Sequence, residues 1–188
     1  MIPESYVGNE IAIYKAVQFP DQWEKIRVLQ SDICAVDTTW ITSGEQRWLL
    51  TYRLQKEQGD LMLMSSDGKT SWCIAENDPY VRPAGPIFRH AEEQFRPAQN
   101  CEGAYGKALR FYKVEEVRDS QYRESCFAEL LPEQITSDLP FAAEGIHTYG
   151  ISDHFEVIDL KGYETDILFY ITRPIWFIWR RIRKVLGR

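Results

Sequence analysis

The chain has 188 residues, of which 44% are hydrophobic and 27% are charged. This composition is typical of a folded globular domain and excludes a disordered chain. The charge is uneven, because residues 173–188 contain six Lys/Arg and no acidic residue, which leaves 16 basic against 28 acidic residues in the part before them. An acidic body argues against nucleic-acid binding by that body, and the basic tail indicates a separate role.

The cysteines are widely spaced, at Cys34, Cys73, Cys101 and Cys126. They form no CxxC pair, so the sequence predicts neither a zinc site nor a redox motif, and we expect no metal and no cofactor. The first ten residues are polar and lack the apolar core of a signal peptide. We therefore expect a reducing, cytoplasmic setting in which the thiols stay free.

Short runs rich in aromatic and β-favouring residues follow one another along the chain, separated by turns rich in Gly, Asp and Ser. The expected strands are 10–14, 24–29, 35–41, 47–53, 61–64, 82–88, 94–99, 108–111, 145–150 and 155–159. The central region offers no convincing amphipathic helix. The pattern predicts an all-β domain over residues 1–165.

Several of these strands recur at a constant spacing. Trp48 and Phe95 are 47 positions apart, and so are Leu61 and Ala108. A period of this size, with about four strands in each unit, is typical of the blades of a β-propeller. We therefore expect four-stranded antiparallel blades, and the alternative is a plain β-sandwich in which the repeat is fortuitous.

The same register leaves incomplete units at both ends. Residues 3–5 align with the end of a second strand, and residues 145–159 supply only two strands of a last unit. A propeller needs about four blades to close, so two full blades flanked by two partial ones predict an open arc. Such an arc is expected to pair with another chain, to associate with itself, or to be the C-terminal part of a longer parent.

Residues 166–188 form a segment of a different kind. Apolar residues recur at helical spacing after Pro174, which suits the first turn of a helix. The apolar run is too short to cross a bilayer, which takes about 20 residues. A basic, Trp-rich amphipathic helix is expected to bind an anionic membrane surface peripherally, or else to dock on the propeller or on a partner. The membrane-binding residues would be Trp176, Trp179, Arg180, Arg181, Arg183 and Lys184.

The motif Arg-Pro-Ala occurs twice, at 82–84 and 96–98. Each proline restricts the neighbouring backbone and so aims its arginine, whose guanidinium group binds phosphate or carboxylate in a bidentate manner. In the propeller register Asp37, Arg82 and His147 take equivalent inner-strand positions, so we expect them at one mouth of the channel. The other ligand-binding groups expected there are Glu4, Arg53, Arg96, Gln99, Asn100 and Tyr105. The alternative for Asp37 is an ion pair with an arginine that holds neighbouring blades together.

Several short motifs occur in a fixed order: MIPES at 1–5, FPDQWE at 19–24, AVDTT at 35–39, RPAG at 82–85, FRPAQN at 95–100 and YG at 105–106. In this order the chain resembles the N-terminal domain of glucosamine inositolphosphorylceramide transferase and its bacterial relatives, over roughly residues 1–160. That domain is similar to the five-bladed propellers of arabinanase- and invertase-type glycoside hydrolases. The resemblance implies that this chain corresponds to the C-terminal part of such a domain, without its first blades.

The resemblance also bears on catalysis. Asp37 resembles the third carboxylate of these hydrolases, which tunes or orients the others. Arg82 stands where the catalytic acid would be expected, and the base would lie in the absent blades. Glycoside hydrolysis generally needs two carboxylates that flank the bond, so we predict binding without hydrolysis and no catalytic residue.

Three functions stay open at this point. The leading hypothesis is a sugar- or glycolipid-associated propeller of glycan metabolism, which binds a sugar phosphate, a nucleotide sugar or a glycolipid headgroup near a membrane. The second is a fragment of a glycosyltransferase- or glycosidase-related enzyme that needs the missing blades or a partner. The third is a structural arc whose open strand edges pair with another chain.

Overall fold

The computed structural model describes residues 1–4, 6–55, 59–135 and 142–163. Within these ranges the chain forms twelve β-strands and two short 3-10 helices, η1 (Tyr6–Gly8) and η2 (Pro132–Gln134). This confirms the all-β class. The described residues contain no helix long and apolar enough to cross a membrane, and the helix predicted at 166–188 lies outside them.

The strands form four antiparallel sheets, and in each sheet the strands are ordered as in the chain. Sheet 1 contains β1 (Glu10–Gln18) and β2 (Gln22–Ser31), and sheet 4 contains β11 (Ala142–Ile151) and β12 (Glu156–Tyr163). Sheet 2 contains β3 (Ala35–Ser43), β4 (Gln46–Arg53), β5 (Asp60–Ser65) and β6 (Ser71–Ala75). Sheet 3 contains β7 (Phe88–His90), β8 (Glu93–Asn100), β9 (Ala108–Arg118) and β10 (Gln121–Leu130).

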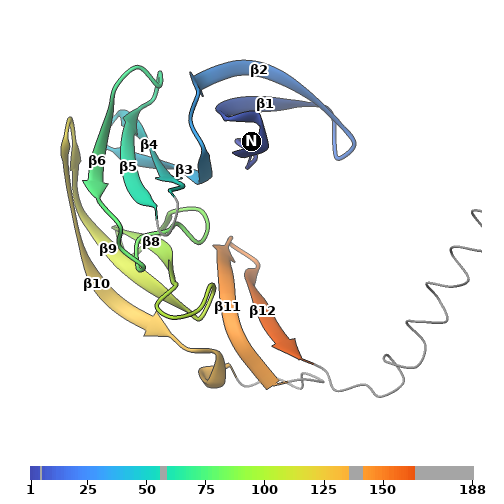
Figure 1. Cartoon of the computed structure of the whole chain (residues 1–188), viewed down its shortest axis with the longest axis vertical. Helices are drawn as coiled ribbons and strands as arrows, with labels where there is room; N and C mark the ends of the chain where they lie inside the picture. Colours follow the sequence, from blue (N-terminus) through green and yellow to red (C-terminus); the bar gives the residue numbers. More distant parts are fainter. Residues whose placement is uncertain (5, 56–58, 136–141, 164–188) are drawn as a thin grey trace, which may run out of the picture.

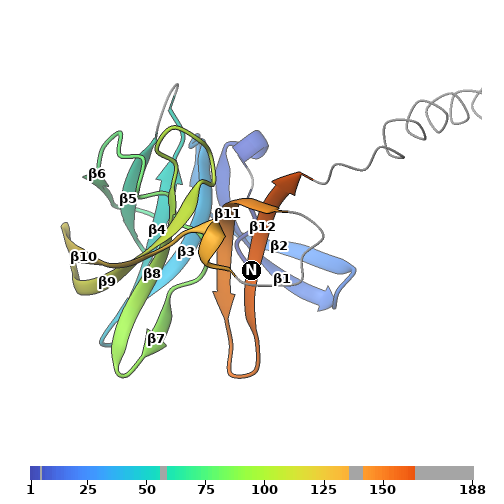
Figure 2. The same cartoon turned by 90° about the horizontal axis from the view of Figure 1, so that it is seen from below.

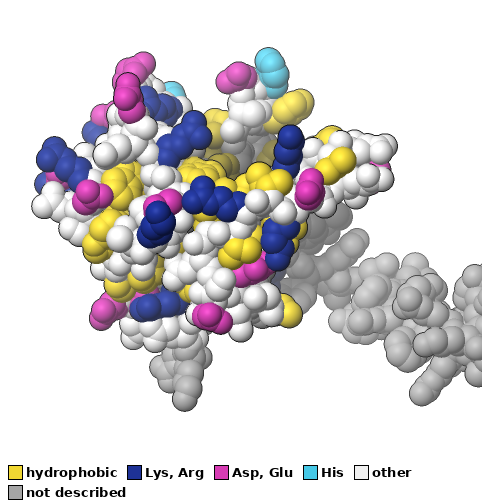
Figure 3. All heavy atoms as spheres, turned by 90° about the horizontal axis from the view of Figure 1, so that it is seen from above, with side chains coloured by type: hydrophobic (Ala, Val, Ile, Leu, Met, Phe, Trp, Pro, Cys, Tyr) yellow, Lys and Arg dark blue, Asp and Glu magenta, His cyan; other side chains and the backbone are white. Residues whose placement is uncertain are grey.

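The sheets follow one another around an arc that stays open between sheet 1 and sheet 4 (Figure 1). β3 and β11 lie toward the inside of the arc, and β6 and β10 lie toward its outside. The β1–β2 hairpin projects from the body of the arc in both views (Figures 1 and 2). On the face shown in Figure 3, basic and acidic side chains are interspersed, so that face carries no field of a single sign.

Each pair of neighbouring sheets encloses its own hydrophobic core. Ile11 and Leu29 of sheet 1 pack with Leu49 and Met64 of sheet 2. The other face of sheet 2 packs on sheet 3 through a cluster that contains Val36, Ile41, Trp48, Leu50, Tyr52, Leu61, Leu63, Val81 and Val117. Sheet 3 meets sheet 4 through Ala84, Leu109, Ile146 and Tyr149. Since both faces of sheet 2 are covered, five consecutive residues of β4, 48–52, are buried instead of alternating with exposed ones.

The strand predicted at 82–88 is wrong in its central part, where the pairing stops. Pro83 forms an isolated bridge with Ala98, and regular pairing resumes only at Phe88. Pro97 has no N–H to donate to the segment around Ala84, and Pro86 has no N–H to donate to β8. A continuous ladder of hydrogen bonds therefore cannot form across residues 85–87.

The break in pairing joins sheet 3 to sheet 4. The Ala84 N–H donates to Pro97 O at 3.0 Å, but Pro97 cannot return the bond. The Ala84 carbonyl instead accepts the N–H of Tyr149 in β11 at 2.7 Å. Gly85 makes this approach feasible, because a Cβ at this position would lie 2.0 Å from the Tyr149 carbonyl oxygen.

The repeat predicts a strand end at 3–5, but residues 3 and 4 are not part of a strand, and Ser5 lies outside the described residues. The first residue nevertheless lies along β1. The Met1 amino group donates to Tyr14 O at 2.8 Å, and the Tyr14 N–H donates to Met1 O at 2.9 Å. In sheet 2 the strand β4 pairs with β5. If β1 is compared with β5, Met1 lies on the side where β4 would lie.

Replacement of Gly85 by alanine tests the junction between sheets 3 and 4. Gly85 has a φ of +145°, and a new methyl group would overlap the Tyr149 carbonyl. We expect Gly85→Ala to lower the free energy of unfolding in urea by about 1–3 kcal/mol. Gly150→Ala is the control, because its Cβ would meet nothing within 4 Å. Equal stability of the two variants would contradict the role assigned to Gly85.

Candidate functional site

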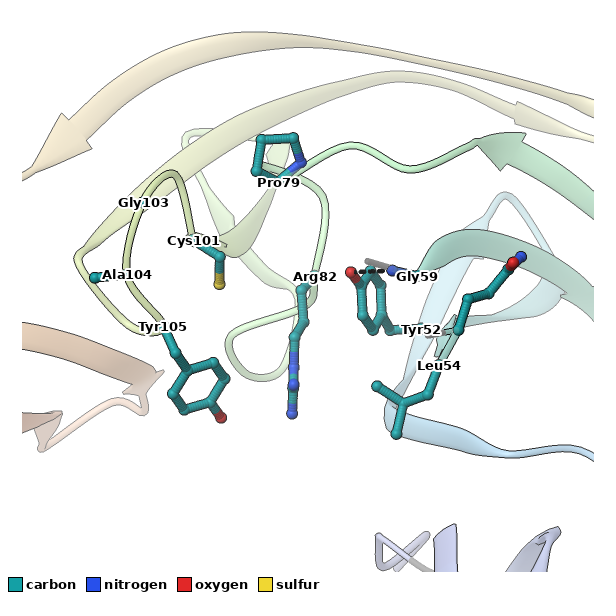
Figure 4. Close-up of a pocket in the computed structure, with 10 residues that line it drawn as sticks. Tyr52, Leu54, Gly59, Pro79, Arg82, Cys101, Gly103, Ala104 and Tyr105 are labelled. Atoms are coloured by element: carbon teal, nitrogen blue, oxygen red, sulfur yellow. Dashed lines mark hydrogen bonds between the residues drawn. The ribbon is translucent and has the colours of Figure 1, made fainter. Parts of the chain in front are cut away.

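The guanidinium group of Arg82 stands between two tyrosine rings (Figure 4). Its central carbon lies 5.6 Å from the centre of the Tyr52 ring and 5.0 Å from that of Tyr105. Its Nε donates to Asp37 Oδ2 at 2.7 Å. Among the described residues, Asp37 is the hydrogen-bond partner of the Arg82 guanidinium group. No described residue accepts a hydrogen bond from Nη1 or Nη2.

A cavity of about 360 Å³ opens beside this guanidinium group. Its described lining comes from β4 and the loop that follows it, from the segment before β7 and from the loop between β8 and β9. The lining residues are Tyr52, Leu54, Gln55, Gly59, Pro79, Arg82, Cys101, Gly103, Ala104 and Tyr105. The cavity is therefore built by two sheets, with one fixed cation and two aromatic rings at its wall.

A β-bulge aims Asp37 at Arg82. Val36 pairs with Tyr52 and Thr39 pairs with Leu50, so the register shifts across Asp37 and Thr38. Asp37 has a φ of +53°, a left-handed conformation that aspartate tolerates better than most residues. Bulges of this kind redirect side chains beside functional sites. The resulting ion pair links sheet 2 to the segment that leads into sheet 3.

His147 lies at the corresponding bulge of β11, where the register shifts between Ile146 and Tyr149. Asp159 Oδ1 accepts the His147 N–H at 3.1 Å, and Asp159 Oδ2 lies 3.2 Å from His147 Nδ1. The tautomer that satisfies these contacts has its proton on Nδ1, which leaves Nε2 to accept the Tyr105 hydroxyl. Sheet 4 thus holds the ring of Tyr105 against Arg82.

The charges at this mouth act on one another. Burial by itself lowers the pKa of Arg82, but the Asp37 carboxylate raises it above its ordinary value, so the guanidinium stays charged. Burial raises the pKa of Tyr105, Arg82 opposes that shift, and Asp37 and Glu4 add to it. The contacts therefore bring Asp37, Arg82, Tyr105 and His147 to one place, and the charge of Glu4 acts on Tyr105.

Arg96 is not at this mouth. Its side chain is fully buried, and its Nε donates to Glu124 at 2.8 Å while its Nη1 donates to Val81 O at 2.9 Å. Its Nη2 also contacts Glu124, and its carbon lies 4.9 Å from the centre of the Tyr112 ring. These partners use the whole guanidinium group in the packing of sheet 3.

Gln99 and Asn100 are buried beneath the loop that carries Tyr105. The Gln99 amide donates to Pro83 O at 3.4 Å, and the Asn100 amide donates to Glu129 at 2.6 Å. The Asn100 side-chain oxygen accepts the Glu102 N–H at 3.0 Å. Both residues therefore position the wall of the cavity from below.

Arg53 points to Asp60, whose carboxylate it contacts through Nη2 at 2.6 Å. Gln55 donates to the same carboxylate. Arg53 is thus engaged at the end of β4 and is not part of the described cavity lining.

Comparison with known protein families adds to this description of the site. The family described as "Glucosamine inositolphosphorylceramide transferase 1, N-terminal" matches residues 1–139. The chain belongs to this family.

Curated relatives of this family are plant proteins named glucosamine inositolphosphorylceramide transferase 1. The proteins from Oryza sativa subsp. indica and subsp. japonica are 25% identical over 137 residues, and the protein from Arabidopsis thaliana is 28% identical over 137 residues. Each match covers 66% of this chain and 18% of the relative, so the chain spans less than a fifth of their length. No solved structure matches the chain.

Family membership does not depend on the tail, which lies beyond the matched residues. The membrane-binding residues predicted at 176–184 also lie outside the described chain. Among the described residues no group of three or more His, Cys, Asp or Glu side chains is placed to hold a metal ion.

Sequence reasoning missed three residues that organise this member of the family. Glu124 neutralises Arg96, Asp159 orients His147, and Cys101 lines the cavity. The role of Asp159 could have been predicted from the sequence, because it is a charged residue opposite a predicted site histidine in the final hairpin. The pairing of Glu124 with Arg96, 28 residues away, has no such local signal.

Truncation of Arg96 tests its structural role. Arg96→Ala leaves the Glu124 carboxylate without its partner, and we expect a loss of about 3–5 kcal/mol in the free energy of unfolding. The double variant Arg96→Met, Glu124→Leu removes both charges and should lose much less. Arg118→Ala, at a side chain that is 73% exposed, is the surface control. If Arg96→Ala were as stable as the control, the buried pair would not support the fold.

Proposed function

We propose that this chain is a propeller-type module that binds an anionic sugar, a sugar phosphate or a glycolipid headgroup at Arg82 and does not hydrolyse it. Arg82 carries this proposal, because its Nε is held by Asp37 while Nη1 and Nη2 have no partner within the described chain. Two terminal amino groups in one plane match two oxygens of a phosphate or carboxylate.

The surroundings of Arg82 suit a ligand of this class. Tyrosine rings offer flat apolar surfaces with a polar tip, and Tyr52 and Tyr105 flank the guanidinium. The cavity of about 360 Å³ is within the range of small-molecule sites. A sugar ring stacked on tyrosine, with its anionic group on Arg82, uses all of these features.

Binding without hydrolysis is supported by the carboxylates near the site. The described lining of the cavity contains no Asp or Glu, and the Asp37 carboxylate is engaged by Arg82. A glycosidase generally needs two carboxylates flanking the bond. The alternative, an enzyme fragment completed by other blades, draws on the relatives' transferase names, and the matched region is 18% of their length.

The relatives' names agree with the chemistry proposed for Arg82. They contain glucosamine, which is a sugar, and inositolphosphorylceramide, which is a phosphorylated lipid. A guanidinium site beside aromatic rings suits a phosphorylated sugar or lipid headgroup. The propeller architecture is supported by the order of four sheets around an arc and by the core between each neighbouring pair (Figure 1).

Binding of inositol phosphate and glucosamine 6-phosphate, measured by isothermal titration calorimetry, tests the site, with myo-inositol as the uncharged probe. Arg82→Gln removes hydrogen bonds from a charged donor, so we expect the Kd to rise roughly 10- to 100-fold. Arg89→Gln, at an exposed arginine of β7, is the control and should bind as the wild type does.

Asp37→Asn gives a second arm to this test. It removes a negative charge that competes with an anionic ligand for Arg82, so we expect phosphate binding to become tighter. No binding by the wild type, or the same Kd for the Arg82 and Arg89 variants, would contradict the proposal.

The basic tail is proposed to hold the protein at an anionic membrane surface on the cytoplasmic side. Each Lys or Arg near such a surface contributes about 1 kcal/mol, and residues 173–188 contain six. We expect deletion of 173–188 to release the protein from phosphatidylserine-containing vesicles in a sedimentation assay. Neutral phosphatidylcholine vesicles are the control, and retention of the truncated protein on anionic vesicles would contradict this role.

A further inference from the structure

Sheets 1 and 4 correspond to two complementary halves of the sheet that is complete in sheets 2 and 3. β11 and β12 occupy the places of β3 and β4, since β11 carries a bulge at 147–148 as β3 does at 37–38. β1 and β2 occupy the places of β5 and β6, because Met1 lies beside β1 where β4 lies beside β5. Joined in the order β11-β12-β1-β2, they would reproduce the order of sheet 2.

Each half-sheet exposes apolar side chains on the face that points away from the neighbouring sheet. Val28 pairs with Ala12, whose neighbours Ile11 and Ile13 pack toward sheet 2, so Val28 faces away and is 41% exposed. Ile26, at the next register shift of β2, is 53% exposed. Ile158 packs toward sheet 3, so Val157 faces away and is 63% exposed. Within the described chain nothing covers these side chains. On sheet 4 the exposed Asp159 and Lys161 share the face of Val157, so this face combines apolar and charged side chains, as the rim of a protein interface does.

The complete sheets carry exposed apolar residues at the matching places. Trp40 pairs with Leu49, so it faces the sheet 1 side of sheet 2, beyond the end of the β1–β2 half-sheet. Phe127 lies 5.2 Å from Phe95 in ring centroids, on the sheet 4 side of sheet 3, and is 68% exposed. Two further strands on sheet 1 would cover Trp40, and two further strands on sheet 4 would cover Phe127.

We propose that two copies of this chain join by pairing β12 of one copy with β1 of the other. The two half-sheets then form a four-stranded sheet, which covers Phe127 of the first copy and Trp40 of the second. A second copy is the occupant that fits. Its β1 and β2 supply the third and fourth strands that sheet 4 lacks, and its β11 and β12 supply the first and second strands that sheet 1 lacks.

Two such junctions close a ring. The described residues of each copy contribute two complete sheets and two halves, so the described parts of two copies give six four-stranded sheets, within the four to eight blades of known propellers. The contact is heterologous, since β12 of each copy meets β1 of the other, and closure stops the growth of a filament. It also gives the outer edges of β1 and β12 a neighbouring strand.

Pairing exchanges one set of backbone bonds for another. In the single chain, Met1 holds the N–H and carbonyl of Tyr14 at the free edge of β1. β12 of the partner presents the same groups from an eight-residue strand, so residues 1–4 leave this edge as the longer strand replaces them.

The mass of the full-length protein, measured by light scattering after size exclusion across a concentration series, tests this assembly. We expect the wild type to reach twice the 22.0 kDa of one chain. Val28→Glu and Val157→Glu each place a charge in the junction at a position that is exposed in the single chain, and each should raise the dimer dissociation constant roughly tenfold or more. Gln121→Glu, at the exposed first residue of β10 and outside the junction, is the matched control.

Mixing the two variants gives the decisive result. A Val28→Glu copy retains an intact β11–β12, and a Val157→Glu copy retains an intact β1–β2, so the mixture contains one junction without a substitution. We expect the mixture to recover the dimer mass while each variant alone does not. A monomeric wild type, or a mixture that stays monomeric, would overturn the proposal. Neither substitution touches the Arg82 cavity, so phosphate binding is tested independently.

Discussion

The ion pair between Asp37 and Arg82 is the contact on which the inner side of this molecule depends. It joins sheet 2 to the segment that enters sheet 3, and both side chains are mostly shielded from water, with 20% and 16% of their surface exposed. An arginine in this position without a carboxylate would leave a partly buried charge uncompensated. With Asp37 bonded to Nε alone, the same pair fixes the guanidinium plane and leaves its outer edge toward the cavity. One interaction therefore holds two sheets together and presents the guanidinium group to the cavity.

The two Arg-Pro-Ala motifs show how pairing context decides the role of an arginine. Arg96 lies in a continuous strand, where the alternation of side chains directs it into the core between sheets 2 and 3, and Glu124 neutralises it there. Arg82 lies in a short paired stretch, where its carbonyl accepts the Gln99 N–H and Pro83 forms a bridge with Ala98, and this pairing stops after Ala84 because Pro97 offers no N–H. The proline of the second motif thus ends the pairing of the first motif. Pro97 also leaves the Ala84 carbonyl for Tyr149, which draws sheet 4 toward the same mouth.

Much of the fold could be predicted from the sequence, since short runs of β-favouring residues between turns depend on local chemistry. The grouping of strands also followed, because the spacing between Trp48 and Phe95 reflects equivalent places in sheets 2 and 3. The grouping of Asp37, Arg82 and His147 was accessible for the same reason. The burial of Arg96 was not, because it depends on Glu124, which lies two strands away in β10 and 28 residues further along the chain. The break at 85–87 depends on Pro97, a residue in another strand, which a reading of 82–88 alone does not consider.

The cavity beside Arg82 lies away from the open ends of the arc, so the proposed binding does not depend on the proposed assembly. The cavity is lined by residues of sheets 2 and 3, and sheet 4 contributes through His147, which holds Tyr105. Every one of these elements has its neighbour within a single chain, so the site is complete before any ring closes. Exposed apolar side chains lie on the far sides of sheets 1 and 4, which no described residue of the same chain covers. A ring of two copies would carry one Arg82 site per chain, and each site would face a channel whose wall the other copy completes. Assembly would then limit which ligands reach the site and leave the contacts that hold the anion unchanged.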